Sequence, residues 1–332
     1  MRRRIALVTM LVLVAIPLAA APAAAKDPDR VRHERVVAYW TAERMASAKP
    51  RDFIRVGGTF KPAAKPDKGP GKPGGGGGGG GSSEPTVTGA SWNGDGTVLK
   101  ASGKVFFTMG GTNYVCSGAV AQDSRSSHSL VLTAAHCAYD EAEKAFATNW
   151  TFIPEYDSAP TRSCAQTTHG CWTAQGLVVH KGYADESGFT AKATEHDFAF
   201  AIVGPGGKSN TQLDATVGWF PITFSASNPD HRYAFGYPAA GKYRGNDLVY
   251  CAGTIFEDGY NANKTWGMGC DMTGGSSGGP WFSSFSSGSG TLSSLNSYGY
   301  SGLKNMYGPK FDSRTQAVYT KANSSTGDTI AP

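Results

Sequence analysis

Short apolar runs separated by turns dominate the chain from residue 85 onward. Several of these runs alternate in side-chain character, which is the period of a β-strand, and residues rich in Gly, Asn and Asp lie between them. Helical periodicity is nearly absent, apart from a short helix expected at 140–144. The pattern predicts an all-β protein, with strands at Val105–Thr108, Ser117–Val120, Leu130–Leu132, Gly176–Val179, Phe198–Val203 and Ala317–Tyr319.

The first 25 residues have a different pattern. Three arginines at positions 2–4 precede an apolar run, Ile5–Leu18, and the segment closes with Ala23–Ala25. This order predicts a secretory signal peptide cleaved after Ala25. No other segment reaches the apolar length of a transmembrane helix, so we expect a secreted, extracellular protein without stable membrane association.

Residues 26–84 form a third region. Asp27–Asp29 reads as a helix start, and a short amphipathic helix is expected within 29–47. The glycine run Gly74–Gly81 predicts a flexible linker. The region could be a disordered tail, but Tyr39–Trp40 and Phe53–Ile54 are apolar enough to dock on a folded body. We therefore interpret 26–84 as a pro-segment and linker, and the pro-segment as a candidate inhibitor of the protein's own site.

Charge supports the same division. Three basic residues fall in 1–25, and 26–84 holds 12 basic and 7 acidic residues, which leaves 16 basic and 19 acidic residues of the chain's 31 and 26 for 85–332. The leader and the pro-segment therefore carry net charges of +3 and +5, and the remaining domain, at −3, is mildly acidic. This balance offers no argument for a nucleic-acid partner.

The stretch Cys270–Pro280, C-D-M-T-G-G-S-S-G-G-P, is too rich in glycine for a helix or a strand. In such a loop Ser277 can point outward while the N–H groups of Gly275 and Ser277 converge on one point. Two convergent donors form an oxyanion hole, which stabilises negative charge on a carbonyl oxygen under attack. A plain Gly/Ser surface turn is the alternative.

A serine nucleophile requires a base and a group that orients the base. The apolar run that starts at Ser129 ends in Ala134-Ala135-His136-Cys137, where small neighbours leave the imidazole room to turn. Asp197 stands at the start of a strongly apolar strand. A carboxylate buried there is costly unless it is paired, which makes Asp197 the candidate partner of His136.

The motifs T-A-A-H-C, H-D-F-A and G-x-S-G-G-P, in the order His136, Asp197, Ser277, resemble the chymotrypsin/trypsin family of serine proteases over about residues 100–320. The resemblance implies two six-stranded antiparallel Greek-key barrels in one domain, 85–332, with the active site between them. Animal members carry an aspartate before the nucleophile that pairs with a newly cut amino terminus. Ser276 stands there in this chain, which is more similar to the secreted bacterial branch that includes trypsin-like enzymes and glutamyl endopeptidases.

All six cysteines lie in the same domain, and secretion favours disulfides. Cys116 with Cys137 matches the family's bridge beside the histidine. Cys164 with Cys171 would close a local loop, and Cys251 with Cys270 would anchor the strand that leads to the nucleophile. No C-x-x-C pair occurs, so we expect neither a metal site nor another cofactor.

Specificity is indicated by two segments. Asp271 stands six residues before Ser277, where trypsin-like enzymes keep the acid that binds Arg or Lys, although the bacterial branch often has an aspartate there without that preference. Ser297, Tyr298 and Gly299 resemble the segment that pairs with the substrate backbone beside the pocket. An ordinary strand with a glycine turn is the alternative.

The resemblance implies a secreted, monomeric serine endopeptidase that acts on proteins or peptides through an acyl-enzyme. Ser277 would attack the carbonyl, His136 would transfer the proton and Asp197 would orient His136. Two other functions stay open, a protease-fold binding or adhesion protein without catalysis and a serine esterase. An organophosphonate probe distinguishes a binding protein from an enzyme, because it modifies only an activated serine. A comparison of amide with ester substrates distinguishes an esterase from an endopeptidase.

Overall fold

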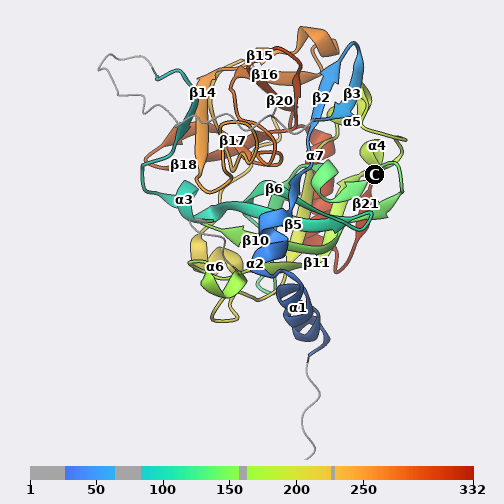
Figure 1. Ribbon diagram of the computed structural model, residues 1–332, viewed down its shortest axis with the longest axis vertical. Helices are drawn as coiled ribbons and strands as arrows, with labels where there is room; N and C mark the ends of the chain where they lie inside the picture. The colour runs from blue at the N-terminus through green and yellow to red at the C-terminus, as the bar shows by residue number, and fades with distance from the viewer. Residues whose placement is uncertain (1–26, 64–83, 157–162, 226–228) are drawn as a thin grey trace, which may run out of the picture.

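The computed structural model describes residues 27–63, 84–156, 163–225 and 229–332 (Figure 1). The expected signal peptide and the glycine run 74–81 lie outside these residues. Two β-structures make up the body, and the predicted two-barrel, chymotrypsin-like fold is confirmed.

Six antiparallel strands close the first barrel. Each pairs with its neighbours in the order β6-β5-β10-β11-β12-β7, and a β6–β7 ladder completes the circle. Large aromatic side chains on these strands, such as Phe106, Phe152 and Phe200, are buried without solvent exposure. The strands are β5 (Ser102–Met109), β6 (Thr112–Ala121), β7 (Ser129–Thr133), β10 (Thr148–Pro154), β11 (Trp172–His180) and β12 (Ala199–Val203).

The second half consists of two sheets that face each other across a second core. One sheet has the order β18-β17-β13-β14-β4, from β4 (Val87–Ser91), β13 (His231–Gly236), β14 (Val249–Thr254), β17 (Pro280–Ser286) and β18 (Ser289–Leu295). The other has the order β15-β16-β20-β19-β2-β3, from β2 (Phe53–Val56), β3 (Thr59–Pro62), β15 (Phe256–Glu257), β16 (Thr265–Gly269), β19 (Tyr298–Tyr300) and β20 (Asn305–Pro309).

Helices and one β-hairpin connect the strands of the barrels or follow them. The helices are α3 (Thr97–Ala101), α4 (Lys181–Ala184), α5 (Ala191–Thr194), α6 (Leu213–Val217) and α7 (Ser313–Ser324), with single 3-10 turns at Ala135–Cys137, Cys164–Gln166 and Gly259–Asn261. The hairpin pairs β8 (Tyr139–Asp140) with β9 (Ala145–Phe146), and β21 (Thr329–Ala331) extends the first barrel beside β11.

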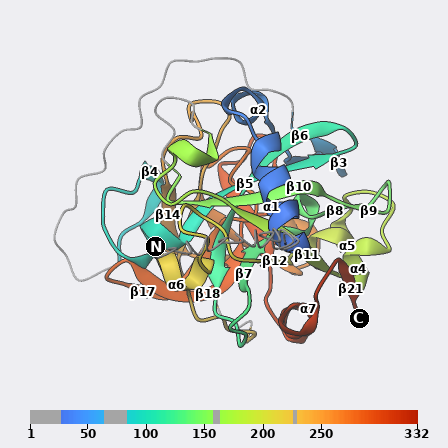
Figure 2. The same ribbon diagram turned by 90° about the horizontal axis from the view of Figure 1, so that it is seen from below.

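The N-terminal segment lies along both barrels, from α1 at the bottom of Figure 1 to β2 and β3 at the top. Asp27 caps α1 (Pro28–Tyr39), and Thr41 caps α2 (Ala42–Ser47), so the expected helix is present as two helices broken at Trp40. Viewed from below, α1 lies over β10 and β11 (Figure 2). The Trp40 side chain is 1% exposed, and its indole N–H donates to the Asn149 carbonyl.

Two strands of this segment pair with the body. β1 (Lys49–Pro50) runs parallel to β6 at Tyr114–Val115, and β2 runs parallel to β19, with Phe53 opposite Tyr298. Because β6 belongs to the first barrel and β19 to the second, the segment between β1 and β2 crosses the junction of the two barrels.

Two local predictions were wrong. Residues 140–144 form the turn of the β8–β9 hairpin, because Lys144 has a φ of +53°, a left-handed conformation that ends a helix. The apolar triplet 317–319 lies in α7, which Asp312 caps, and Val318 is buried with Thr315 and Ala322 at helical spacing. The other expected strands and the three disulfides, Cys116–Cys137, Cys164–Cys171 and Cys251–Cys270, are confirmed.

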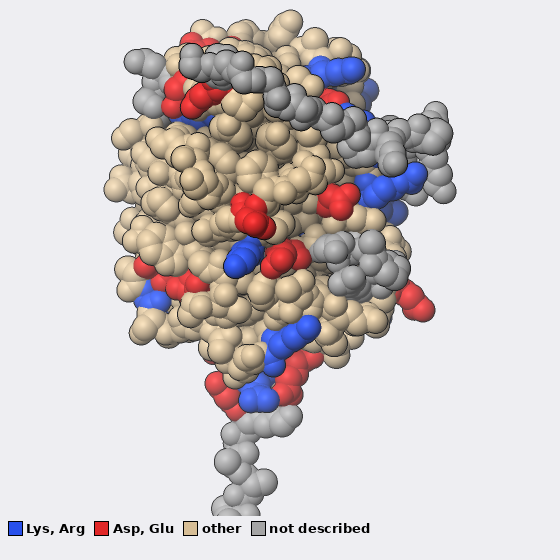
Figure 3. Space-filling model, turned by 90° about the vertical axis from the view of Figure 1, so that its left-hand side faces the viewer, with Lys and Arg blue, Asp and Glu red and all other residues tan. Residues whose placement is uncertain are grey.

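Charged side chains are sparse on the face shown in Figure 3, and they lie as small groups of both signs. No continuous basic surface is visible on that face. Among the described residues, no helix has the length and apolar character needed to cross a membrane.

Candidate active site

The loop that carries Ser277 is held in a conformation that requires glycine. Gly275 and Gly278 have φ values of +97° and +82°, and a Cβ on Gly278 would come within 2.4 Å of the Ser117 carbonyl oxygen. The Ser117 hydroxyl donates to the Gly275 carbonyl at 2.8 Å, and the Ser117 N–H donates to the Ser277 carbonyl at 2.7 Å. Strand β6 of the first barrel thus fixes a loop that leads into β17 of the second.

His136 and Asp197 come together at the same junction. His136 follows β7 and Asp197 precedes β12, and these adjacent strands bring His136 Nδ1 to 2.8 Å from Asp197 Oδ2. The His136 N–H donates to Asp197 Oδ1 at 2.9 Å, and Ser297 Oγ donates to Asp197 Oδ2 at 2.5 Å. Asp197 is fully buried, and these donors compensate its charge.

Asp52 of the N-terminal segment lies at the nucleophile loop. Its Oδ1 accepts a hydrogen bond from the Gly275 N–H at 3.2 Å and another from Ser277 Oγ, also at 3.2 Å. Burial raises the pKa of Asp52 above its usual value, and the hydrogen bonds from Gly275 and Ser277 and the charge of His136 oppose that rise. A side-chain carboxylate oxygen therefore lies at the Gly275 N–H, one of the two donors expected to form an oxyanion hole, and at the Ser277 hydroxyl.

Aromatic rings enclose His136. The Phe53 ring stacks on Phe189 at a centroid distance of 4.1 Å, and both rings meet the imidazole edge to face at 5.5 Å. His136 Nε2 is buried and has no hydrogen-bond partner among the described residues. The imidazole is thus oriented by Asp197 on one side and covered on the other.

Solved structures of proteases share this arrangement of strands. Protease Anisep from Arthrobacter nicotinovorans is 39% identical, with a TM-score of 0.60 over 68% of this chain and 96% of that one. The thermostable serine protease AL20 from an extremophilic microorganism is 37% identical, with the same TM-score over 69% of this chain and 100% of that one. This chain belongs to the family of bacterial chymotrypsin-like serine proteases.

A Glu endopeptidase structure, 18% identical, matches 72% of this chain and 98% of its own at a TM-score of 0.53, a likeness of fold alone. No protein-family model matches the sequence, and no curated protein matches it.

Asp271, the residue expected at the bottom of the protease's specificity pocket, is engaged inside the chain. Its Oδ2 lies 2.6 Å from Lys242 Nζ, and its Oδ1 accepts from the Tyr243 hydroxyl at 2.5 Å. Burial, followed by the bond to Asp271, raises the pKa of Tyr243, so the hydroxyl stays a donor. Both carboxylate oxygens therefore have partners before a substrate arrives.

The segment expected to hold a substrate backbone has two separate roles here. Ser297 faces inward to Asp197, whereas Tyr298 and Gly299 pair with Phe53 and Ile54 of β2. The Tyr298 hydroxyl donates to the buried Asp258 carboxylate at 2.6 Å. Because Asp258 lies between β15 and β16, this bond fixes β19 against the β15–β16 hairpin. The edge of β19 that faces away from β20 is thus the one with which β2 pairs.

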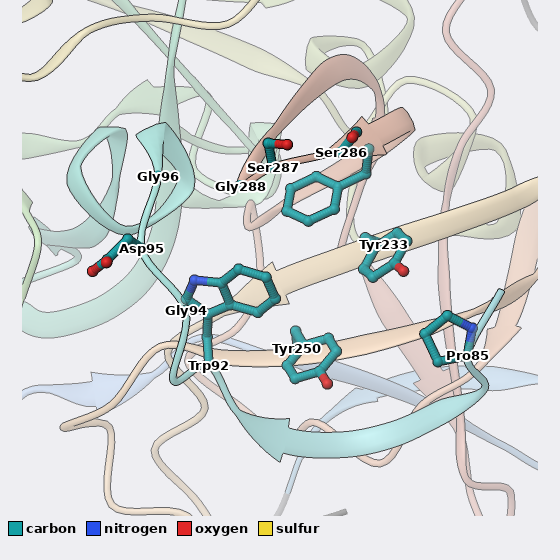
Figure 4. Close-up of a pocket in the computed structure, with 11 residues that line it drawn as sticks. Pro85, Trp92, Gly94, Asp95, Gly96, Tyr233, Tyr250, Ser286, Ser287 and Gly288 are labelled. Atoms are coloured by element: carbon teal, nitrogen blue, oxygen red, sulfur yellow. The ribbon is translucent and has the colours of Figure 1, made fainter. Parts of the chain in front are cut away.

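Two further features of the described residues are a cluster of possible metal ligands and a hollow. Cys116, His136 and Cys137 lie close enough to hold a metal ion, but the two cysteines form a disulfide. A hollow of about 700 Å³ lies instead beside β4, lined by Trp92, Tyr233, Tyr250, Phe285 and Pro85 (Figure 4). None of the residues around Ser277 lines it.

Sequence reasoning missed the residues that come from the N-terminal segment and from the loop before α5. Arg51, Asp52 and Phe53 carry no motif, and Phe189 lies in a loop without periodicity. The only available signal was the apolar pair Phe53–Ile54, which indicated docking but not where the segment docks.

Proposed function

We propose that this chain is the precursor of a secreted serine endopeptidase, and that Ser277, His136 and Asp197 carry its chemistry. One observation supports this most directly: a carboxylate oxygen lies at the Gly275 N–H and the Ser277 hydroxyl, beside a His136–Asp197 pair. Anions bind where donors are arranged for a developing negative charge. Proteins and peptides are the substrates, no cofactor takes part, and the enzyme acts as a monomer.

The reaction proceeds in two acyl-transfer steps. The Ser277 oxygen bonds to the scissile carbonyl carbon while His136 Nε2 takes the hydroxyl proton, and Gly275 and Ser277 N–H groups stabilise the oxyanion. His136 then gives its proton to the departing amine as the carbon–nitrogen bond breaks. Water repeats the sequence on the ester and releases the acid. Asp197 holds the imidazole and stabilises its charged form.

In the precursor, residues 28–63 act as the inhibitor of this site. Asp52 takes the hydrogen bond of Ser277 Oγ that His136 would need to accept, and it also takes the hydrogen bond of the Gly275 N–H, one of the two proposed oxyanion donors. The group presented there is a side-chain carboxylate, which offers no peptide bond for attack. Phe53 covers the imidazole at the same time. The enzyme therefore holds its own segment without cutting it at this point.

Removal of 26–84, together with the signal peptide 1–25, yields the active domain 85–332. Trp40, Met45 and Phe53 are buried against that domain, so the segment must be released by cleavage followed by dissociation. Ser276 in place of an aspartate is consistent with activation by loss of the inhibitor rather than by a new amino-terminal salt bridge.

On the acyl side of the cleft, β19 binds the substrate backbone through Tyr298 and Gly299, at the edge that β2 occupies here. The chain direction of β2 is opposite to that of such a substrate, because the residues of β2 follow Asp52 in the chain. Cleavage after Arg or Lys requires Asp271 to meet the substrate cation, and Lys242 already neutralises that carboxylate. The geometry therefore weakens the prediction of basic specificity, and cleavage-site profiling decides it.

The test compares the intact secreted chain, the chain after limited cleavage in 64–83, and the same two samples of Ser277→Ala. An organophosphonate should label only the cleaved wild-type chain, and peptide hydrolysis should appear with the label. Labelling with turnover of esters but not amides would indicate an esterase. Absence of label after removal of the segment would make a binding protein the better description.

A further inference from the structure

Arg51 occupies a site built from the turn after His136. Its guanidinium donates to the His136 carbonyl oxygen and lies 3.7 Å from Asp140 Oδ2 and 3.6 Å from Glu141 Oε2. The Arg51 side chain is only 12% exposed, and its guanidinium carbon lies 5.4 Å from the Phe53 ring centroid. The site thus holds a cation between three oxygen acceptors and an aromatic face.

The protease body fixes both carboxylates independently of Arg51. Asp140 Oδ1 accepts from the N–H groups of Ala142 and Glu143, each at 3.1 Å, which leaves Oδ2 for the guanidinium. Glu141 is 3% exposed, and the Tyr183 hydroxyl donates to its Oε2 at 2.8 Å. The site is therefore preorganised and belongs to the part of the chain that remains after activation.

The position of this site relative to Ser277 follows from the order of the bound segment. Phe53 pairs with β19, Asp52 lies at Ser277, and Arg51 lies beyond Ser277, next to β1 on β6. Arg51 is thus on the side of the nucleophile opposite β19. If β19 holds the acyl part of a substrate, the opposite side holds the leaving group.

We propose that Asp140, Glu141 and the His136 carbonyl form a cation subsite for the leaving-group side of the substrate, which favours Arg within the first two residues after the scissile bond. This inference rests on the proposed endopeptidase function. Arg51 is the occupant of that subsite in the precursor, and a substrate arginine replaces it in the active enzyme.

Charge balance gives the physical reason. Release of Arg51 leaves two neighbouring carboxylates, one of them the Glu141 carboxylate that is 3% exposed while Arg51 is bound, without a cation among the contacts of the described residues. An uncompensated buried charge is unfavourable, so a substrate that restores the cation regains that stabilisation on binding. A planar guanidinium can meet three separated acceptors, whereas a lysine ammonium meets them less well.

The test uses enzyme activated from the full chain and peptides with one acyl-side sequence chosen by cleavage profiling. The first or second residue after the scissile bond is Arg, Lys or citrulline, a neutral isostere of Arg. We expect kcat/KM to be about tenfold higher for Arg than for citrulline at one of the two positions. Glu141→Gln and Asp140→Asn should each remove most of that preference, and Glu143→Gln, which changes an exposed acid of the same turn, should keep it.

Equal rates for Arg and citrulline peptides at both positions in the wild-type enzyme would overturn the subsite, as would a preference that survives both substitutions. If Glu141→Gln does not fold, the partly exposed Asp140→Asn decides the matter. Failure to cut any peptide, with the enzyme verified as processed, would instead remove the endopeptidase function on which the inference rests.

Discussion

Ser277 donates its side-chain hydrogen bond to Asp52, at 3.2 Å, and His136 Nε2 has no hydrogen-bond partner among the residues described. The serine and the base that should activate it are therefore neighbours that do not interact in this form of the chain. In the proposed mechanism, activation returns that hydrogen bond to His136.

Replacing Asp52 by Ala in the intact chain should raise the rate of organophosphonate labelling of Ser277 about tenfold or more. The reason is the loss of two hydrogen bonds to a carboxylate, each worth about 1.5 kcal/mol or more. The labelling rate measured by mass spectrometry checks this. Glu43→Ala, which removes an exposed acid of α2, should leave the rate unchanged.

The pH dependence of the chain's stability should reveal the raised pKa of the Asp52 carboxyl group. Burial raises the pKa of Asp52 above 3.8, so the folded chain holds its proton more tightly than the unfolded chain does. The protonated Asp52 side chain therefore contributes to the stability of the folded chain at low pH. That contribution is lost as the pH rises from about 4 through the raised pKa of Asp52. Melting curves of the Ser277→Ala chain, with and without Asp52→Asn, should differ least at the acidic end and more toward neutrality.

The two chains should differ in melting temperature by an amount that grows as the pH rises. A difference that stays constant or shrinks would contradict a raised pKa for Asp52. Asparagine is the matched replacement because it resembles the protonated acid in shape.

Trp40→Ala should weaken docking of the N-terminal segment by about 3 kcal/mol, the cost of removing a buried aromatic ring. The indole is 1% exposed and bonded to the Asn149 carbonyl, so its loss leaves both a cavity and an unpaired acceptor. Faster proteolysis of residues 27–63 in the intact chain would report this. Val31→Ala, at an exposed position of α1, is the control and should change little.

Ser297→Ala should lower kcat/KM of the activated enzyme about tenfold, mainly through kcat. The buried Asp197 carboxylate would lose one of its donors, and hydrogen bonds to charged groups contribute about 1.5 to 3 kcal/mol. Steady-state kinetics on one peptide measure the effect. Ser301→Ala, at an exposed position, should behave as the wild type, and an unaltered Ser297→Ala enzyme would refute a positioning role for that hydroxyl.

Much of the body could be predicted from the sequence because its information is local. The strands follow from short alternating apolar runs, and the loop around Ser277 follows from glycines whose φ values only glycine adopts easily. The triplet 317–319 shows the limit of that reasoning, since three apolar residues fit a strand or one face of a helix. The cap at Asp312 and the packing of Val318 decided for the helix.

By itself, the sequence determined most of the strands, the disulfide-forming cysteines and the three residues proposed for catalysis, because each is marked by residue type and spacing. The arrangement in two barrels was implied by the family resemblance of the motifs around those three residues. Only the tertiary structure decided how the N-terminal segment crosses the cleft, how Asp52 meets Ser277, and how Arg51 meets Asp140 and Glu141. Arg51 and His136 lie 85 positions apart in the sequence, and Asp52 and Ser277 lie 225 positions apart. Such pairs carry no local pattern, since their energies arise only when packing removes water from between them.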